Sequence, residues 1–216
     1  MFEAKKYTLE EFLSAVRSDW ENNGDMRTDT IHCNGFGDGS KTSCELATRL
    51  ENDLFDICSR LTGTYGGKVL MGHNGYTEVR FWGEKTLATP DGRHNGDFLA
   101  QGLTPSRLKK IPFATDVINS ISSLEKTTMA GGNVVNIILP SDKITLDICE
   151  GFIRAVADSS VVSLQLNCTT KEQLLDAQKH PEKYPDLIVR VCGFSARFTA
   201  LSPEWQREVL TRNYYR

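Results

Sequence analysis

The second half of the chain alternates between strand-like and helix-like segments, and this alternation restricts its fold more than any other feature. Three short apolar runs are typical of buried strands, at 133–139, 161–167 and 186–191. Four segments have the apolar spacing of helices, at 116–124, 145–157, 171–179 and 202–212. This order predicts an α/β fold in which β/α units surround a parallel or mixed sheet, either open or closed into a barrel.

The first half predicts two amphipathic helices separated by irregular segments. A capping box, Thr8-Leu9-Glu10-Glu11, begins a helix that is predicted over 9–20. A second helix is predicted over 43–61, and its apolar stripe consists of Leu46, Leu50, Leu54, Ile57 and Leu61. The residues between the helices, 21–41, are rich in Asn, Gly, Asp, Thr and Ser and predict a long irregular connection. Glycine turns recur through 63–102, where we expect mostly loop with short strands.

The composition disfavours several classes of function. The 216 residues are 39% hydrophobic with a formal net charge of −3, which favours neither nucleic acids nor membrane surfaces as partners. The apolar runs are far shorter than the roughly 20 residues that span a bilayer. The first residues lack the apolar core of a secretory signal, so we expect a cytoplasmic protein. A chain of this length folds as one large domain or as two small ones.

The cysteines are scattered without paired spacing, at positions 33, 44, 58, 149, 168 and 192. Because no C-x-x-C pair occurs, the sequence argues against a zinc site, a thioredoxin-like redox site and an iron–sulfur cluster. In a reducing compartment, free and mostly buried thiols are expected. The sequence therefore predicts no metal site.

One segment, residues 190–198, places a glycine among apolar and basic residues: Arg-Val-Cys-Gly-Phe-Ser-Ala-Arg-Phe. On its own, Gly193 would mark a bulge or a turn with a positive φ. Glycine is also the residue best suited to carry a radical on its Cα. The unpaired electron spreads into both neighbouring amides when the carbon is planar, and a β-carbon would crowd that geometry and hinder approach to the Cα–H bond.

This segment resembles the radical loop of the glycyl radical enzymes of the pyruvate formate-lyase type, which begins Arg-Val-x-Gly followed by an aromatic residue. Three other segments resemble that family in the same order: the T-P-D-G-R turn at 89–93, the Q-x-N strand residues at 165–167, and the helix and turn at 174–184. The resemblance extends over nearly the whole chain. It implies a helical part at 1–88, a glycine radical domain at 89–216, and a contribution of C-terminal strands and helices to a β/α barrel.

The resemblance also implies a function and a set of partners. Gly193 would store an organic radical for a cysteine in the N-terminal portion of the enzyme. A separate radical SAM activating enzyme with an iron–sulfur cluster would install the radical by using S-adenosylmethionine, while the chain itself would bind no cofactor. The expected partners are this activating enzyme and either the N-terminal portion of a glycyl radical enzyme or a full-length lyase. The implied setting is anaerobic metabolism.

The other residues of the loop are expected to have local roles. If the loop inserts into a barrel core, an apolar wall that shelters the radical is expected from Val191, Phe194 and Phe198. Cys192 is expected to be a small buried thiol, and Ser195 a hydrogen-bonding residue, because no histidine base is evident near it. Arg190 and Arg197 are expected to form ion pairs or to bond the backbone. The turn at 89–93 would face solvent in isolation, whereas the resemblance implies that it packs near the barrel.

Complete members of the family carry the radical-accepting cysteine in a G-C-x-E or C-C motif. Cys44 and Cys149 each precede a glutamate here, but neither lies in such a motif, so the chain is expected to be inactive alone. Three alternatives stay open: a split or truncated enzyme, a spare part that repairs an oxygen-cleaved lyase, and an interaction module without a radical. The substrate and reaction class also stay open. Anaerobic ribonucleotide reductase matches less well because it carries a cysteine zinc site near its glycine.

Overall fold

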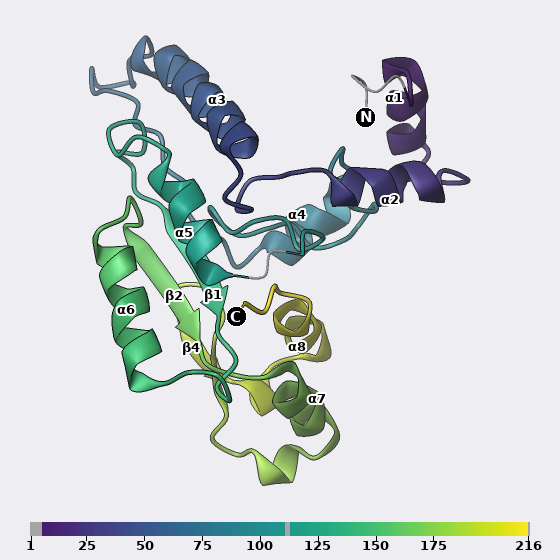
Figure 1. Ribbon diagram of the computed structural model, residues 1–216, viewed down its shortest axis with the longest axis vertical. Coiled ribbons are helices and arrows are strands. Elements are labelled where there is room, and N and C mark those ends of the chain that lie inside the picture. Colours follow the sequence, from purple (N-terminus) through teal and green to yellow (C-terminus); the bar gives the residue numbers. More distant parts are fainter. Residues whose placement is uncertain (1–5, 111–112, 216) are drawn as a thin grey trace.

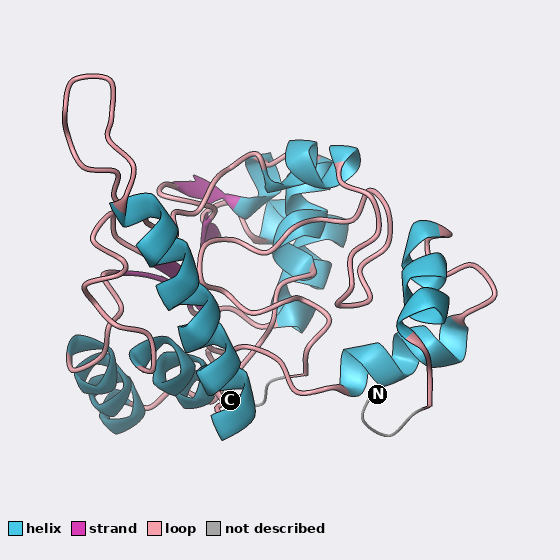
Figure 2. Cartoon of the chain, turned by 90° about the horizontal axis from the view of Figure 1, so that it is seen from above, coloured by secondary structure: helices cyan, strands magenta, loops and turns pink. Residues whose placement is uncertain are grey.

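The computed structural model describes residues 6–110 and 113–215. Figures 1 and 2 show two N-terminal helices, α1 (Leu9–Arg17) and α2 (Gly24–His32), to one side of the larger body of the protein. The other helices are α3 (Lys41–Ser59), α4 (Val79–Lys85), α5 (Ala114–Ser122), α6 (Leu146–Ala157), α7 (Lys171–Lys179) and α8 (Pro203–Leu210). The strands are β1 (Val134–Ile138), β2 (Ser163–Asn167), β3 (Ile188–Arg190) and β4 (Ser195–Arg197).

A β/α/β unit forms the centre of the body. Strands β1 and β2 pair in parallel, with Val134 opposite Ser163, and α6 connects them. Thr145 begins α6 by accepting a hydrogen bond from the Ile148 backbone N–H. The main hydrophobic core lies here, where Val135 of β1 and Ile121 of α5 are both fully buried. The predicted α/β fold with a parallel strand pair is therefore confirmed.

A second core lies under the C-terminal segments. Strands β3 and β4 form an antiparallel hairpin, and α7 and α8 pack beside it. Their shared core consists of Leu174, Ala177, Val189, Val191, Phe198, Val209 and Leu210. The short connection between β3 and β4 is residues 191–194, so the glycine segment is the tip of a hairpin anchored on a small core of its own.

Two helices occur where the sequence predicts irregular structure. The segment 21–41 contains α2, and the segment 63–102 contains α4. Helix α2 lacks an amphipathic stripe, so periodicity gives no signal for it. Tertiary contacts stabilise it instead, since Met26 packs in a cluster with α1 and Arg27 donates to the Gly92 carbonyl at 2.7 Å. Among the described residues of 63–102, the expected short strands are reduced to isolated bridges.

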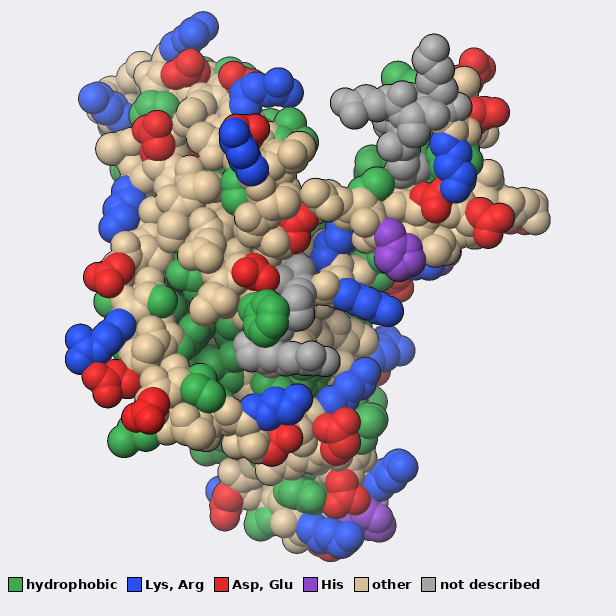
Figure 3. All heavy atoms as spheres, in the orientation of Figure 1, with side chains coloured by type: hydrophobic (Ala, Val, Ile, Leu, Met, Phe, Trp, Pro, Cys, Tyr) green, Lys and Arg blue, Asp and Glu red, His purple; other side chains and the backbone are tan. Residues whose placement is uncertain are grey.

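Helix α3 forms as predicted but turns its apolar stripe outward. The stripe side chains are 41–59% exposed: Leu46, Leu50, Leu54 and Ile57 on α3, and Leu61 just beyond its end. The opposite face is anchored by Glu51, whose carboxylate lies 2.9 Å from His73 Nε2, and by Thr48, which donates to the Ser123 carbonyl. Figure 3 shows charged side chains of both signs scattered over the visible surface. The stripe is thus an exposed apolar surface on an otherwise mixed exterior.

We expect the isolated chain to self-associate through this stripe, because burying it removes apolar area from water. Sedimentation of the purified chain should give an average mass above that of the monomer. Replacing Leu50 and Leu54 together with Gln should shift it toward the monomer, whereas Glu45→Gln on the same helix should not. A compact, stable monomer of the unmodified chain would contradict this expectation.

None of the helices in residues 6–110 and 113–215 has the length and apolar character that a membrane crossing requires.

Candidate functional site

The glycine segment forms a tight turn at the tip of the β3–β4 hairpin. Gly193 has φ = +71°, and the Val191 backbone N–H donates to the Phe194 carbonyl at 2.9 Å to close the turn. This left-handed conformation costs an L-residue other than glycine about 1–2 kcal/mol. A β-carbon placed on Gly193 would meet no heavy atom within 4 Å apart from its chain neighbours. A β-carbon at this position would therefore hinder a planar Cα through its own attachment and not by contact with other side chains of this chain.

The open side of Gly193 faces a hollow of about 400 Å³. The hollow is lined by the loop itself, by residues 74–78, and by Val134, Ser163 and Gln165 of the central strands. Gly193 is exposed in the chain as described. Gly193 thus lines an open hollow, and the position of a β-carbon on it is unobstructed.

The aromatic and aliphatic neighbours of Gly193 divide into two groups. Val191 and Phe198 are fully buried in the C-terminal core, where they fix both ends of the turn. Phe194 is 46% exposed and lies outside that core, and its place in the expected apolar wall, which depends on insertion of the loop into a barrel, stays a prediction.

The Cys192 side chain lies on the inner side of the turn. It is 7% exposed, and its Sγ lies 3.0 Å from the position that a β-carbon on Gly75 would occupy. Burial raises the pKa of this thiol above its ordinary value, so it is protonated at neutral pH. The expectation of mostly buried cysteines is wrong elsewhere, because Cys33 and Cys168 are exposed and the remaining three are partly exposed. Residues 6–110 and 113–215 contain no cluster of His, Cys, Asp and Glu fit to hold a metal ion.

The polar residues of the loop make local contacts. Arg190 Nη1 donates to Ser195 Oγ at 3.4 Å, across the hairpin. Arg197 lies 3.5 Å from the Asp186 carboxylate in an exposed ion pair. Such exposed pairs contribute little to stability.

Strand β2 holds the loop through two amide side chains. Gln165 Oε1 accepts the Gly193 backbone N–H at 3.1 Å. Asn167 binds the backbone of Arg190 twice, accepting its N–H at 2.6 Å and donating to its carbonyl at 3.2 Å. Both side chains are at least 95% buried. The Q-x-N side chains thus hydrogen-bond the backbone of the loop and hold it against β2.

An arginine from the end of the chain holds the loop on another side. Arg212 donates to the Arg190 carbonyl at 2.9 Å and to the Val191 carbonyl at 2.7 Å. The Glu208 carboxylate, on α8, accepts from Arg212 at 2.6 Å and from Arg107 at 2.5 Å. Glu208 is fully buried and Arg212 nearly so. Sequence reasoning missed this pair, although a glutamate and an arginine four residues apart beside Val209 and Leu210 were a visible signal.

The buried polar network continues from Glu208 into the central sheet. Gln101 Nε2 donates to Glu208 Oε1 at 3.4 Å, and Asn136 of β1 donates to Gln101 Oε1 at 2.8 Å. Burial lowers the pKa of Arg107, which keeps its charge at neutral pH because arginine starts from a very high value. The loop, the last helix and the central strand are in this way joined by one chain of hydrogen bonds.

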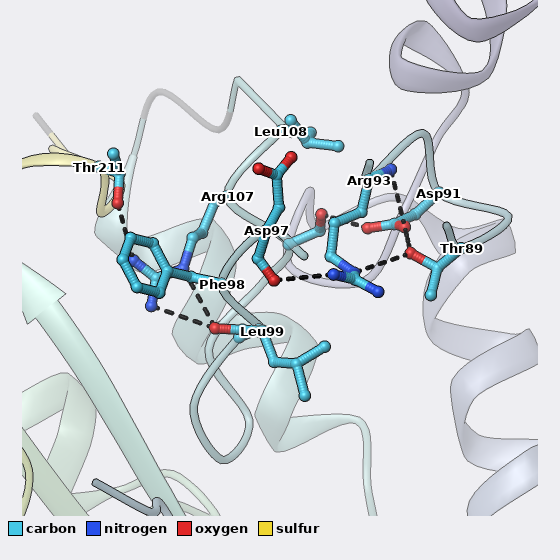
Figure 4. Close-up of a pocket in the computed structure, with 11 residues that line it drawn as sticks. Thr89, Asp91, Arg93, Asp97, Phe98, Leu99, Arg107, Leu108 and Thr211 are labelled. Carbon is cyan, nitrogen blue, oxygen red and sulfur yellow. Dashed lines mark hydrogen bonds between the residues drawn. The ribbon is translucent and has the colours of Figure 1, made fainter. Parts of the chain in front are cut away.

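The T-P-D-G-R turn is buried at Gly92 and Arg93, whereas Pro90 is exposed and Thr89 and Asp91 are partly exposed. Arg93 is 5% exposed and donates to the carbonyls of Asp97, Thr86 and Leu87. Its own carbonyl accepts from Trp20 Nε1, so the turn also ties the N-terminal helices to the body. Figure 4 shows the turn beside a hollow of about 340 Å³, with Arg93 on one side and Arg107 against Phe98 on the other. The turn has a packing role here.

Comparisons with known proteins find relatives of this chain. Residues 99–199 match the family model described as glycine radical. The chain is 37% identical over 157 residues to the probable dehydratase YbiW of Escherichia coli, covering 69% of this chain and 19% of that protein. It is 30% identical to the isethionate sulfite-lyase of Desulfovibrio desulfuricans, covering 98% of this chain and 26% of that protein.

Two solved structures of dehydratases are also similar to this chain in sequence and in fold. The B12-independent glycerol dehydratase from Clostridium butyricum is 30% identical, with a TM-score of 0.87 over 100% of this chain and 28% of that one. The hydroxyproline dehydratase of Clostridioides difficile is 25% identical, with a TM-score of 0.86 over 98% of this chain and 27% of that one. The chain therefore spans about a quarter of the length of these relatives, or less.

Proposed function

Because this chain belongs to the glycyl radical enzyme family and corresponds to its C-terminal region with the radical domain, we propose that it stores an organic radical on Gly193. A radical SAM activating enzyme removes one hydrogen atom from the Gly193 Cα, and S-adenosylmethionine is consumed in that step. The remaining electron is shared with the two adjoining amides. The observation that carries the proposal is the exposed turn, in which the Gly193 Cα faces open space while its neighbours are anchored.

The stored radical serves a cysteine that this chain does not supply. Cys44 lies in α3 and Cys149 in α6, and both are helical residues without a G-C-x-E or C-C motif. We therefore propose that the cysteine belongs to an N-terminal portion or a partner chain, which packs on this one. The exposed apolar stripe of α3 supports a covering partner.

The reaction catalysed by the assembly is proposed only at the level that the relatives share. Their names include dehydratases, a sulfite-lyase and a formate acetyltransferase, which differ in the bond that is broken. Radical storage is common to these proteins by family, and substrate contacts are expected mainly in the portion that supplies the cysteine. Cytoplasmic location and anaerobic metabolism are part of the same proposal.

Two other functions remain as alternatives. A spare-part protein would restore turnover to a lyase whose C-terminal region oxygen has cut away. An interaction module would bind such a lyase without accepting a radical. Sequencing the reading frame upstream and co-expressing it with this chain distinguish the split enzyme, the spare part and the interaction module. A G-C-x-E or C-C pair in that reading frame identifies a split enzyme and its reaction class.

We expect the purified chain to show no formate, aldehyde or amine release when supplied with the activating enzyme alone, since no thiyl-forming cysteine is present. Turnover should appear only when the cysteine-bearing portion is added. Turnover by the chain alone that survives replacement of all its cysteines with Ser would overturn the proposed relay.

A further inference from the structure

The radical loop is held from two directions by buried polar side chains. Gln165 and Asn167 project from the same face of β2, because alternate residues of a strand point to the same side. They bind the Gly193 N–H and both backbone groups of Arg190. Arg212 reaches the loop from the end of α8 and binds two consecutive carbonyls. We name these three side chains the clasp.

All contacts of the clasp fall on the N-terminal half of the loop. They end at the Gly193 nitrogen and include no group of Phe194, which is 46% exposed. Glu208 fixes the Arg212 guanidinium by accepting from both Nε and Nη2, and Arg107 and Gln101 hold Glu208 in turn. Because these partners belong to helices, strands and buried segments, the clasp gives the first half of the loop a rigid frame.

The observed backbone at Gly193 is not the geometry of a delocalised radical. An unpaired electron on the Cα spreads into the preceding amide only when that amide lies in the plane of the radical carbon, which requires φ near 180° or 0°. Gly193 has φ = +71°. Forming the delocalised radical therefore requires a rotation about the N–Cα bond, and glycine is the residue that permits it at lowest cost.

We propose that the clasp fixes the Gly193 nitrogen during this rotation, so that the Gly193–Phe194 peptide swings while residues 190–192 stay in place. Gln165 and Arg212 are then positioning residues for the radical centre. The Gln165 hydrogen bond is the decisive contact, because it acts on the N–H of the nitrogen that shares the electron. This inference rests on the proposed radical function of Gly193.

The first test uses the chain with its partner before activation and does not depend on a radical. Hydrogen exchange of the 190–194 amides should be about 10-fold faster in Gln165→Met, which has similar length but no acceptor, than in the unmodified chain. Gln165→Glu keeps an acceptor oxygen and should restore slow exchange at Gly193. Gln178→Met, on the exposed surface of α7, is the matched control and should leave the exchange rates of the 190–194 amides unchanged.

Arg212→Lys tests the second side of the clasp. A lysine ammonium is a point charge that cannot bind two carbonyls and a carboxylate in the forked geometry of arginine. We expect exchange of the 190–194 amides to be about 10-fold faster in this variant. Arg207→Lys, at an exposed position of α8, the helix that precedes Arg212, should match the unmodified chain.

The second test uses the activated assembly. Electron–nuclear double resonance of the radical should detect one well-defined exchangeable hydrogen on the Gly193 nitrogen, and Gln165→Met should broaden or shift that coupling while Gln165→Glu restores it. Identical exchange and identical couplings in Gln165→Met and the unmodified assembly would overturn the clasp. The amides of residues 190–192 should not exchange faster after activation. If they do, the proposal that the N-terminal half of the loop stays fixed is overturned, even where the coupling changes in Gln165→Met. Absence of any radical in the unmodified assembly would instead overturn the proposed function and the rotation with it, while the exchange data would still decide whether the clasp holds the loop.

Discussion

Replacing Gly193 with alanine is expected to abolish both the radical and the oxygen-dependent chain cut in the activated assembly, while leaving the chain folded. A methyl group has room at this site, since no other heavy atom lies within 4 Å of its position. The positive φ should cost about 1–2 kcal/mol of folding stability, which a folded domain tolerates. The chemistry is lost because the methyl group hinders abstraction at the Cα and the rotation to a planar radical. Electron paramagnetic resonance and gel electrophoresis after exposure to air measure the two outcomes.

A matched glycine separates this chemical effect from backbone strain. Gly96 has φ = +80°, and a β-carbon there also meets nothing within 4 Å. Gly96→Ala should therefore carry a similar strain and keep the full radical signal. Cys192→Ser should also keep it, because the buried thiol is not required to form the radical. A normal signal in Gly193→Ala would show that the radical lies elsewhere.

Removing the Glu208 carboxylate is expected to cause the largest loss of folding stability in the C-terminal region. Glu208 is fully buried and binds Arg107 and Arg212, which are themselves largely buried. Glu208→Gln would leave two cations without their counter-charge, and breaking a buried pair in this way typically costs 3–5 kcal/mol, so we expect a loss of about that size. Denaturant unfolding followed by circular dichroism measures the change in unfolding free energy.

The control lies on the same helix. Glu204 is partly exposed in the first turn of α8, and its pKa is lowered chiefly by a hydrogen bond from Ser202. Glu204→Gln should change the unfolding free energy by about 0.5 kcal/mol or less. A loss below about 1 kcal/mol in Glu208→Gln would mean that solvent or rearrangement compensates the two arginines, and that the network does not form a rigid frame.

The central β/α/β unit could be predicted from the sequence because each element carries a strong periodic signal. Residues 134–138 form a short apolar run, and α6 and α7 begin at threonine N-caps followed by amphipathic spacing. Helices α2 and α4 carry no such signal. The first has polar residues on all sides and depends on contacts with a turn 65 residues away in sequence, between Arg27 and Gly92. Local patterns cannot reveal stabilisation of that kind.

Part of the candidate site could likewise be predicted from the sequence and part could not. The glycine loop was visible because its chemistry is concentrated in nine consecutive residues. The residues that hold it come from two distant segments, and only folding brings Gln165 and Asn167 of β2, and Arg212 after α8, to the loop. The stripe on α3 shows the complementary limit, since periodicity predicts an amphipathic helix but does not indicate whether its apolar face meets this chain or another.

The most direct test of the central claim is electron paramagnetic resonance of the anaerobically activated assembly, formed from this chain, its cysteine-bearing partner and the cognate activating enzyme. One hydrogen remains on the Gly193 Cα after abstraction, so the signal should be a doublet, and deuteration of glycine at that carbon should collapse it. Exposure to air should then cut the chain at Gly193 and release a C-terminal piece that begins near Phe194. A fully reconstituted assembly that gives neither the doublet nor the cut would contradict radical storage at Gly193 and favour the interaction module instead.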